Sequence, residues 1–371
     1  MKTKKVRIRP TEEQEEKLFQ SAGVHRFIYN WALAKQQENH KLGNKFLSDG
    51  VLRKEVTQMK KLDEYLWIGE VSNDVAKQAV KDACDAYKRF FKGLSDHPKF
   101  KSKKKSRPSF YNDTFKLKVE GKKVRLLKIG WVKTSEKLPE NTKYYNPRIT
   151  FDGKYWYLSV AFEEDNTATI LTDEVIGIDL GIKDLAVCSN GEVYKNINKS
   201  EKVKKKEKKL RRLQRKVSRK YQYNKKGGTF VKTSNIIKIE KQIRLLQRSL
   251  SNIRKNHTHQ TTTSIVKTKP RRIVIEDLNV SVMMKNKHLA KAIQKQGFYE
   301  FRRQLEYKCK WLGIELIIAD RWYPSSKTCN CCGTIKKELK LSDRVYRCEC
   351  GYENDRDLNA ALNLAKYELA V

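Results

Sequence analysis

The sequence predicts a multidomain α/β protein, and three observations lead to this fold class. The chain has 371 residues, which is enough for two or three domains. Short apolar strands and amphipathic helices alternate from Glu174 to the C-terminus, as they do in α/β sheets. Five of the eight cysteines lie between Cys329 and Cys350, which predicts a small metal-binding insertion in this second half.

The charge of the chain predicts a polyanionic partner. Lys and Arg number 81 against 43 Asp and Glu, for a net charge of +38. Solubility needs far less charge, and nucleic acid is the usual partner of so basic a protein. A hydrophobic content of 39% disfavours a disordered basic tail. We expect no membrane span and no secretory signal, and the clustered cysteines predict a reducing, cytoplasmic compartment.

The first part of the chain predicts a basic strand followed by helices. Residues 4–10 predict the strand, and Thr11 with Gln14 forms a capping box that begins a helix. Further helical segments are expected at 24–40 and at about 73–92. The stretch 11–95 is therefore expected to be a small helical domain.

A basic loop and a β-rich region are expected next. Residues 99–107 carry six positive charges in nine positions, which favours contact with a phosphate backbone. Asp152-Gly153 joins two alternating segments, 148–151 and 154–162, and this is a strong hairpin signal.

The second half predicts an α/β sheet of the ribonuclease H type. Strands are expected at 175–181, 185–189, 192–195, 271–278 and 314–319, and helices at 199–257, about 288–312 and about 356–369. Within 199–257, two helices around Gly227-Gly228 are predicted to form an antiparallel hairpin. This segment has 22 Lys and Arg against three Glu, which is half the net charge of the protein. A merely solvated coiled coil is disfavoured, because solvated helices mix both signs of charge.

Two acids interrupt apolar strands of this predicted sheet. Asp179 lies in an otherwise apolar strand with Gly177 and Gly181 on its face, and Glu276 ends another apolar strand. A lone buried carboxylate is costly, so either residue needs compensation. Active-site groups in α/β sheets gather at the carboxyl ends of strands. Asp179 alone would also fit an actin-like ATPase strand.

A third acid is expected at the start of the last helix, where Asp355 and Asp357 are the candidates. We favour Asp357, because Asp355 is well placed as the N-cap and its carboxylate would then be occupied by backbone N–H groups. Three converging acids require cations, and oxygen ligands suit two Mg²⁺ or Mn²⁺ ions. Such a pair supports phosphodiester hydrolysis, so a metal-dependent nuclease is the leading hypothesis.

The cysteines predict one structural zinc ion. Cys329 and Cys332 form the first pair and Cys348 and Cys350 the second, each followed by a glycine that allows a tight turn. Cys331 could replace Cys332, although Cys329-x-x-Cys332-Gly has the better ligand geometry. Four protein ligands leave no open position, so the zinc is expected to be structural.

These motifs, in this order, resemble the TnpB family of insertion-sequence "transposase" proteins, relatives of type V CRISPR effectors. The similarity covers essentially the whole chain. Its motifs are Phe27-Ile-Tyr-Asn-Trp-Ala-Leu, His97-Pro-Lys-Phe-Lys, Gly177-Ile-Asp-Leu-Gly, Ile275-Glu-Asp-Leu, Trp322-Tyr-Pro-Ser-Ser-Lys-Thr-Cys and Asp355-Arg-Asp-Leu-Asn-Ala-Ala. The second cysteine pair departs from the family's commoner Cys-x-x-Cys, which affects the ribbon geometry more than the metal.

The resemblance implies an RNA-guided, Mg²⁺-dependent DNA endonuclease. Its guide would be a noncoding RNA from the transposon end, and its target double-stranded DNA beside a short motif read by the protein. One RuvC site would carry Asp179, Glu276 and Asp357, within a nuclease domain at 171–371 that holds the basic hairpin 199–257 and a zinc ribbon at 325–354. Residues 1–10 and 96–170 would form a wedge-like β-barrel domain, and 11–95 the helical recognition domain.

Other expectations concern assembly and alternative functions. We expect one protein chain per ribonucleoprotein, in the cytoplasm of a prokaryote and at the nucleoid when bound to DNA. A strand-joining transposase and a non-catalytic nucleic-acid-binding repressor are the alternatives. The presence of all three acids disfavours the repressor.

Overall fold

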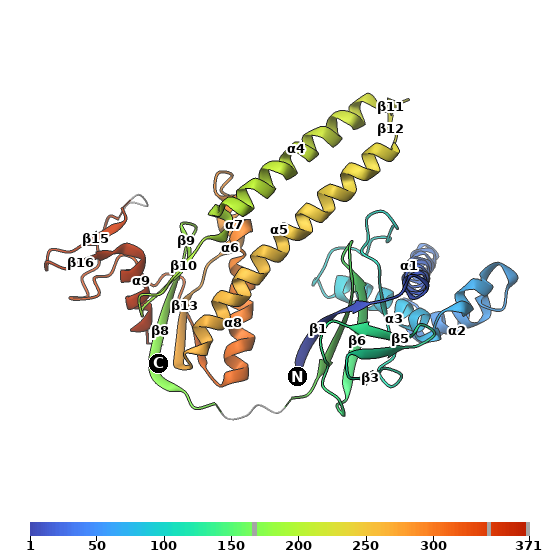
Figure 1. The fold of residues 1–371 in the computed structure, drawn as a ribbon, viewed down its shortest axis with the longest axis horizontal. Helices are drawn as coiled ribbons and strands as arrows, with labels where there is room; N and C mark the ends of the chain where they lie inside the picture. Colours follow the sequence, from blue (N-terminus) through green and yellow to red (C-terminus); the bar gives the residue numbers. More distant parts are fainter. Residues whose placement is uncertain (165–168, 340–342, 369–371) are drawn as a thin grey trace. The chain divides into compact units, whose positions relative to one another are not determined.

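The computed structural model describes residues 1–164, 169–339 and 343–368. The chain divides into two compact units, Met1–Asp165 and Asn166–Val371 (Figure 1). Three short parts of the predictions lie outside the described residues: 165–168 of the wedge region, 340–342 of the ribbon, and Leu369 of the last helix. In the described part of the chain, no helix has the length and apolar character needed to cross a membrane.

The first unit begins with a single strand and continues with helices. They are α1 (Glu12–Lys41), α2 (Asp49–Met59), the 3-10 helix η1 (Asp63–Glu70) and α3 (Asn73–Phe91). The expected capping box begins α1: the Gln14 main-chain nitrogen donates to Thr11 Oγ1 over 3.3 Å, and the Thr11 nitrogen donates to Gln14 Oε1 over 3.2 Å. The expected segment 24–40 is the second half of this continuous helix rather than a separate one.

A seven-stranded sheet completes the first unit. Its strands are β1 (Lys2–Arg9), β2 (Ser109–Tyr111), β3 (Lys118–Glu120), β4 (Lys123–Leu126), β5 (Gly130–Thr134), β6 (Tyr144–Phe151) and β7 (Trp156–Phe162). They pair in the order β2-β6-β7-β1-β5-β4-β3, so β2 and β3 are the edges. Within residues 1–164, the strand pairing leaves two edges, so the expected barrel is not confirmed. The β6–β7 hairpin forms as predicted, with Gly153 at φ +94° in its turn.

Helices and sheet of the first unit share one hydrophobic core, and polar contacts reinforce it. Arg148 of β6 donates to both carboxylate oxygens of Asp82 on α3, over 2.7 and 2.6 Å. The same carboxylate contacts buried His25 of α1 at 3.1 Å. The Arg148 guanidinium and the His25 ring hold the pKa of Asp82 well below its usual range despite burial. One ionised carboxylate thus connects three elements.

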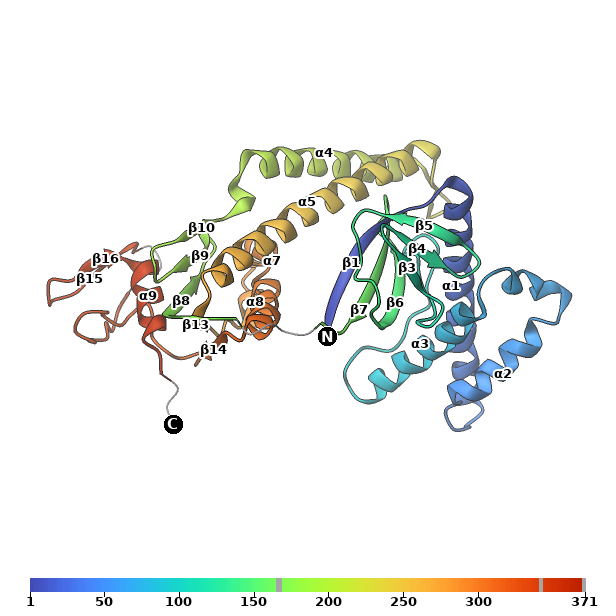
Figure 2. The ribbon, with the colours of Figure 1, turned by 60° about the horizontal axis from the view of Figure 1, so that its bottom comes forward.

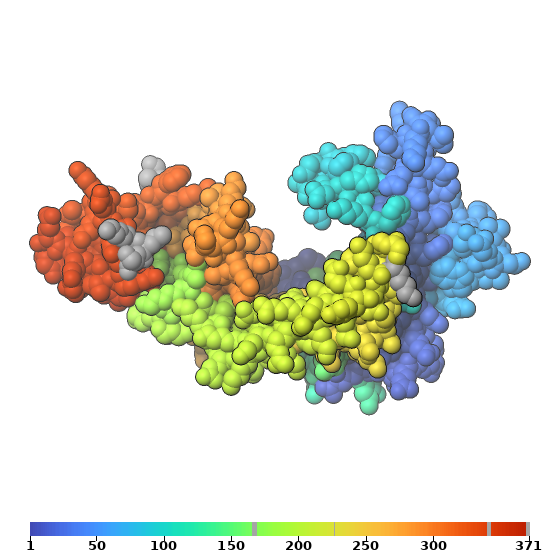
Figure 3. Space-filling model, turned by 90° about the horizontal axis from the view of Figure 1, so that it is seen from above, coloured from blue at the N-terminus to red at the C-terminus, as the bar shows by residue number. Residues whose placement is uncertain are grey.

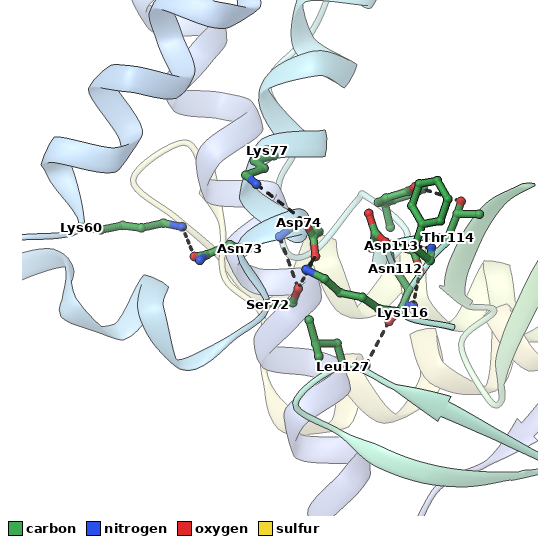
Figure 4. Close-up of polar contacts among 12 residues, drawn as sticks. Lys60, Ser72, Asn73, Asp74, Lys77, Asn112, Asp113, Thr114, Lys116 and Leu127 are labelled. Carbon is green, nitrogen blue, oxygen red and sulfur yellow. Dashed lines mark hydrogen bonds and ion pairs between the residues drawn. The ribbon is translucent and has the colours of Figure 1, made fainter. Parts of the chain in front are cut away.

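A second set of contacts joins the start of α3 to the segment after β2 (Figure 4). The Lys116 ammonium donates to buried Asp74 over 2.8 Å, and the Ser72 hydroxyl donates to the same carboxylate oxygen over 3.1 Å. Nearby, the Leu127 main-chain nitrogen donates to Asn112 Oδ1 over 3.2 Å. These contacts fix the helices against loops of the sheet.

The second unit is built on a five-stranded mixed sheet. Its strands are β8 (Thr172–Leu180), β9 (Asp184–Cys188), β10 (Val193–Lys195), β13 (Pro270–Glu276) and β14 (Glu315–Ala319). They pair in the order β10-β9-β8-β13-β14. The first three strands are antiparallel, whereas β13 is parallel to both β8 and β14. The predicted mixed α/β architecture is confirmed.

Helices cover both faces of this sheet. They are α5 (Ser234–Lys267), α6 (Val280–Met283), α7 (Ala290–Gln296), α8 (Phe298–Leu312) and α9 (Arg356–Ala365). Helices α5 and α8 pack on the face of Ile178 and Ile275, and α9 packs on the opposite face, that of Val274. The single helix expected at 288–312 is wrong, because Gly297 adopts a left-handed conformation and separates α7 from α8. Helix α9 ends at Ala365, earlier than expected.

A helical hairpin projects from the sheet, as predicted (Figures 1 and 2). Helices α4 (Glu201–Tyr223) and α5 pack side by side, and the short strands β11 (Lys225–Lys226) and β12 (Thr229–Phe230) form the tip. Gly227 and Gly228 turn the chain there, at φ +51° and +80°, where a side chain would be strained. The space-filling view shows the hairpin, in green and yellow, as a long accessible surface (Figure 3).

Candidate active site and metal centre

Two of the predicted acids meet at the carboxyl edge of the second sheet. Strands β8 and β13 pair in parallel with Ile178 beside Ile275, so Asp179 and Glu276 occupy the next position on each strand. Both acids are on the face that α9 covers, because Ile178 and Leu180 on either side of Asp179, and Ile275 before Glu276, pack in the opposite core. The Leu180 main-chain nitrogen donates to Glu276 Oε1 over 3.1 Å, which orients this carboxylate between the strands.

Gly177 is the reason that α9 reaches this edge so closely. A Cβ at position 177 would lie 2.0 Å from the carbonyl oxygen of Ala361 and 2.4 Å from the nitrogen of Ala365. The backbone of α9 therefore occupies the space where any other residue would place a side chain. The predicted role of Gly181 is similar but weaker, since a Cβ there would lie 3.2 Å from the Asp184 carbonyl oxygen.

The two candidates for the third acid have different surroundings. Asp355 is the N-cap of α9, and its Oδ1 accepts hydrogen bonds from the main-chain nitrogens of Asp357 and Leu358, over 2.9 and 3.2 Å. Asp357 lies in the first turn, with a side chain 18% exposed and an ion pair to Arg344 at 3.9 Å. Its charge acts on both Asp179 and Glu276. Asp357 therefore lies close enough for its charge to act on the other two acids, whereas the carboxylate of Asp355 is occupied as a cap.

The electrostatics of the three acids favour a bound cation. Burial, and then the charges of Glu276 and Asp357, raise the pKa of Asp179 well above its usual range. Burial also raises the pKa of Glu276, and the Asp357 charge adds to this effect. Without a cation, the state in which these carboxylates are ionised together is therefore unfavourable. Carboxylate oxygens are the donor set of Mg²⁺ and Mn²⁺, and none of the three residues is fully buried, so these residues fit the expected ions.

An ion-pair cluster beside Glu276 was not predicted from the sequence. Asp277 accepts from Arg302 of α8 over 3.0 Å and also pairs with Arg321, which follows β14. The sequence shows a second acid, Asp277, directly after Glu276, but its arginine partners are distant in the chain. Only packing could identify which arginines approach it.

The predicted zinc ligands form one cluster. The sulfur atoms of Cys329, Cys332, Cys348 and Cys350 lie within 4.8 Å of one another. Cys329 and Cys350 are 3.7 Å apart, and Cys332 and Cys348 are 3.6 Å apart. Four thiolates at ~2.3 Å from a tetrahedral zinc ion would be ~3.8 Å apart, so the cluster fits this metal.

The turns of the ribbon explain this geometry. Gly333 and Gly351, at φ +75° and +85°, follow the first and second cysteine pairs as the sequence suggested. Strands β15 (Val345–Arg347) and β16 (Glu353–Asp355) pair on either side of the second knuckle, and α9 follows β16 directly. Cys331 is exposed and outside the cluster. The ligand choice left open by the sequence therefore falls on Cys332.

The ribbon is attached directly to α9. Buried Asn363 donates to the carbonyl oxygens of Ser325 and Thr328, each over 2.7 Å, and Asn359 donates to the Thr328 carbonyl over 2.8 Å. The next turn of the helix toward its start carries Asp357. The ribbon that carries the four cysteines and the side chain of Asp357 are thus both attached to α9.

Polar contacts also connect the basic hairpin to the loop after Asp179. Glu207 of α4 pairs with Arg254 of α5 at 2.7 Å, and Arg254 donates to Asn198 over 2.7 Å. Asn198 in turn donates to buried Gln296, which donates to the Gly181 carbonyl oxygen over 2.7 Å. The base of the hairpin therefore supports the chain two residues beyond Asp179.

Comparison with known proteins identifies the family. Three family models match: "Helix-turn-helix domain" at 1–45, "Probable transposase" of the OrfB/IS605 type at 157–287, and "Cas12f1-like, TNB domain" at 298–364. The Escherichia coli K12 protein "Putative RNA-guided DNA endonuclease InsQ" is 32% identical, over 97% of this chain and 90% of the relative. The chain belongs to the TnpB family. A Streptomyces pristinaespiralis relative, "Putative RNA-guided DNA endonuclease", is 33% identical over 99% and 89% of the two chains.

Solved structures share the fold of this TnpB-family chain. A chain of the Cas12f1-sgRNA-target DNA complex matches with a TM-score of 0.62 at 15% identity, covering 95% of this chain and 82% of that one. The mini-RNA-guided endonuclease CRISPR-Cas phi3 matches with a TM-score of 0.52 at 11% identity, over 98% and 92%. At such low identity, these similarities show the fold alone.

Proposed function

We propose that this TnpB-family protein is an RNA-guided DNA endonuclease with one RuvC-type active site formed by Asp179, Glu276 and Asp357. The observation that supports the proposal is that Asp179 and Glu276 lie near the ends of the adjacent parallel strands β8 and β13. Helix α9 packs on the same strands and carries Asp357 close enough for its charge to act on both acids. The names of the relatives from Escherichia coli and Streptomyces support the guided endonuclease activity.

The three carboxylates would hold two Mg²⁺ or Mn²⁺ ions. When bound, such ions supply activation of water and stabilisation of the leaving oxygen in phosphodiester hydrolysis. The chain itself contributes position: the Leu180 N–H orients Glu276, and Gly177 lets α9 bring Asp357 to the sheet. The carboxylate of Asp355 caps α9, so we assign the metal-binding role to Asp357.

The nucleic-acid partners follow from the charge and from the relatives. The guide would be an RNA derived from the transposon, and the target double-stranded DNA beside a short recognition motif. Exposed lysines and arginines along α4 suit the phosphate backbone of such a complex. We assign residues 11–95 to target recognition, 1–10 with 96–170 to a wedge role, and 171–371 to the nuclease.

The test begins with the ribonucleoprotein expressed from its own locus. We expect one discrete RNA to co-purify, and its 3′ segment to direct Mg²⁺-dependent cleavage of matching DNA. Asp179→Asn, Glu276→Gln and Asp357→Asn should each slow cleavage by roughly a hundredfold or more, with binding retained. Asp173→Asn is the matched control, since this carboxylate is exposed at the other end of β8.

The outcomes separate the alternatives. Cleavage that survives all three substitutions would rule out this active site. Heterogeneous RNA that moderate salt removes would rule out the guide. Joining of transposon ends to target DNA without RNA would instead favour a strand-transferase.

A further inference from the structure

Trp322 is the most exposed of the six tryptophans, with 85% of its surface open to solvent. It lies in the turn that follows β14, within a motif to which the proposed chemistry gives no role. A ring of this size offers a binding partner a large apolar face together with an N–H donor.

The turn that carries Trp322 is well fixed. The Trp322 main-chain nitrogen donates to Asp320 Oδ1 over 2.7 Å, and the Tyr323 nitrogen donates to the Asp320 carbonyl oxygen over 3.1 Å. The Asp320 nitrogen donates to the Tyr367 hydroxyl over 3.1 Å, and the rings of Tyr367 and Tyr323 pack edge to face at 4.8 Å. The exposed ring therefore projects from an ordered backbone.

The residues on either side attach this turn to the elements that carry the proposed active site. Arg321 pairs with Asp277, which directly follows Glu276 on β13. Tyr323 donates its hydroxyl to the Asn363 carbonyl oxygen of α9, the helix that carries Asp357. In addition, Ala319 at the end of β14 pairs with Glu276 in the sheet. Trp322 is thus held at the same edge as the three acids.

We infer that Trp322 is a stacking platform for a nucleobase of the DNA strand that enters the active site. The inference rests on the proposed function, which makes DNA the substrate. An aromatic face binds any base, but only a base that is unpaired or at a strand end has a free face to offer. The expected occupant is therefore single-stranded DNA. Such stacking would position the strand beside the acids without reading its sequence.

The test compares binding after removal of the Trp322 ring from the protein, of the bases from the DNA, or of both. Full-length Asp179→Asn protein, in which cleavage is disabled, is titrated by fluorescence anisotropy with a labelled twelve-residue oligothymidylate. The second ligand is the same backbone with abasic residues. Both titrations are repeated with Trp322→Ala, at several salt concentrations. Loss of one stacked base weakens binding by about 5- to 150-fold, without changing the salt dependence.

We expect the preference for thymidylate over the abasic strand to fall at least about fivefold in Trp322→Ala. Trp322→Phe should keep most of the preference, and its thermal unfolding should match that of the parent. Tyr299→Ala, which removes another exposed aromatic ring of the same unit, is the control and should keep the preference fully.

An unchanged preference in Trp322→Ala would overturn the inference, and so would an equal loss of affinity for both strands. Cleavage by the wild-type ribonucleoprotein is measured separately. Guided cleavage with no effect of Trp322 on base binding would refute the platform alone. Ring-dependent base binding without cleavage would refute the nuclease and leave the stacking site.

Discussion

The backbone of α9 at Ala361 fills the position that a side chain at Gly177 would need, since a Cβ there would lie only 2.0 Å from the Ala361 carbonyl oxygen. This contact sets how near the helix carrying Asp357 comes to the strand carrying Asp179. In the proposed active site, a residue without chemistry of its own therefore controls how closely Asp357 can approach Asp179.

Gly177→Ala should disrupt this arrangement. We expect a loss of ~1–3 kcal/mol in the free energy of unfolding, because α9 must move away from β8. Cleavage should fall much further, since Asp357 moves with the helix. Urea unfolding and cleavage rates measure the two effects. Gly23→Ala in α1 is the control, because its Cβ would meet nothing within 4 Å and helix propensity favours alanine by up to ~1 kcal/mol. Normal cleavage by Gly177→Ala would contradict this role.

Substitution of single cysteines should distinguish ligands from a bystander. We expect one zinc ion per chain in the wild type and in Cys331→Ser, and loss of zinc in Cys332→Ser. The reason is that Cys332 is 3.6 Å from Cys348, whereas Cys331 is exposed outside the cluster. Metal analysis of the purified variants measures the content. Retention of zinc by Cys332→Ser with loss in Cys331→Ser would reverse the assignment.

Asp82→Asn should make the stability of the protein less dependent on pH. At pH 7 we expect a cost of about 2–3 kcal/mol, because Arg148 loses its ionised partner. The pKa of Asp82 is lowered in the folded state, so its stabilisation is present above the unfolded value and is lost as pH falls below about 4. The difference between variant and wild type should therefore shrink in acid.

Denaturant unfolding at pH 7, 5 and 3.5 measures this change. Asp85→Asn on the same helix is the control, because its exposed pair with Lys88 at 3.9 Å should contribute under about 0.5 kcal/mol. A cost for Asp82→Asn that stays constant across this range would exclude the ionised pair as its origin.

Charges on α4 should set the salt dependence of RNA binding. Replacing exposed Lys208, Arg211, Arg212 and Arg215 together with Gln should lower the slope of log Kd against log salt. The expected change is up to about 0.7–0.9 for each residue that contacts a phosphate. Gln214→Ala with Ser218→Ala, on the same helix, should leave the slope unchanged. Equal slopes for both variants would show that RNA binds elsewhere.

Gln296→Ala should affect catalysis without weakening the affinity for nucleic acid. Its side chain is buried and donates to the Gly181 carbonyl oxygen over 2.7 Å, so its loss removes a buried hydrogen bond from the loop after Asp179. We expect a stability cost of ~1–3 kcal/mol and slower cleavage at saturating RNA and DNA. Exposed Gln294→Ala, on the same helix, should change neither quantity. Parallel losses in binding and cleavage would argue against a positioning role.

Much of the architecture could be predicted because its signals are local. The capping box of α1, the Asp152-Gly153 hairpin and the break at Gly227-Gly228 each depend on neighbouring residues. Gly297 shows where such reasoning fails. Amphipathic spacing on both sides suggested one helix across it, whereas the left-handed backbone of this glycine separates two helices.

The sequence by itself determined the chemical groups of this protein: acids within apolar strands, paired cysteines with glycines after them, and a basic hairpin. Only the tertiary structure decided which residues lie near one another. It occupied Asp355 as a cap and placed Asp357 where its charge acts on Asp179, and it gathered Cys332 rather than Cys331 with the other cysteines. The physical reason is that spacing fixes the direction of a side chain on its own element. The distance between elements depends on how closely their surfaces pack, as the contact of α9 with Gly177 demonstrates.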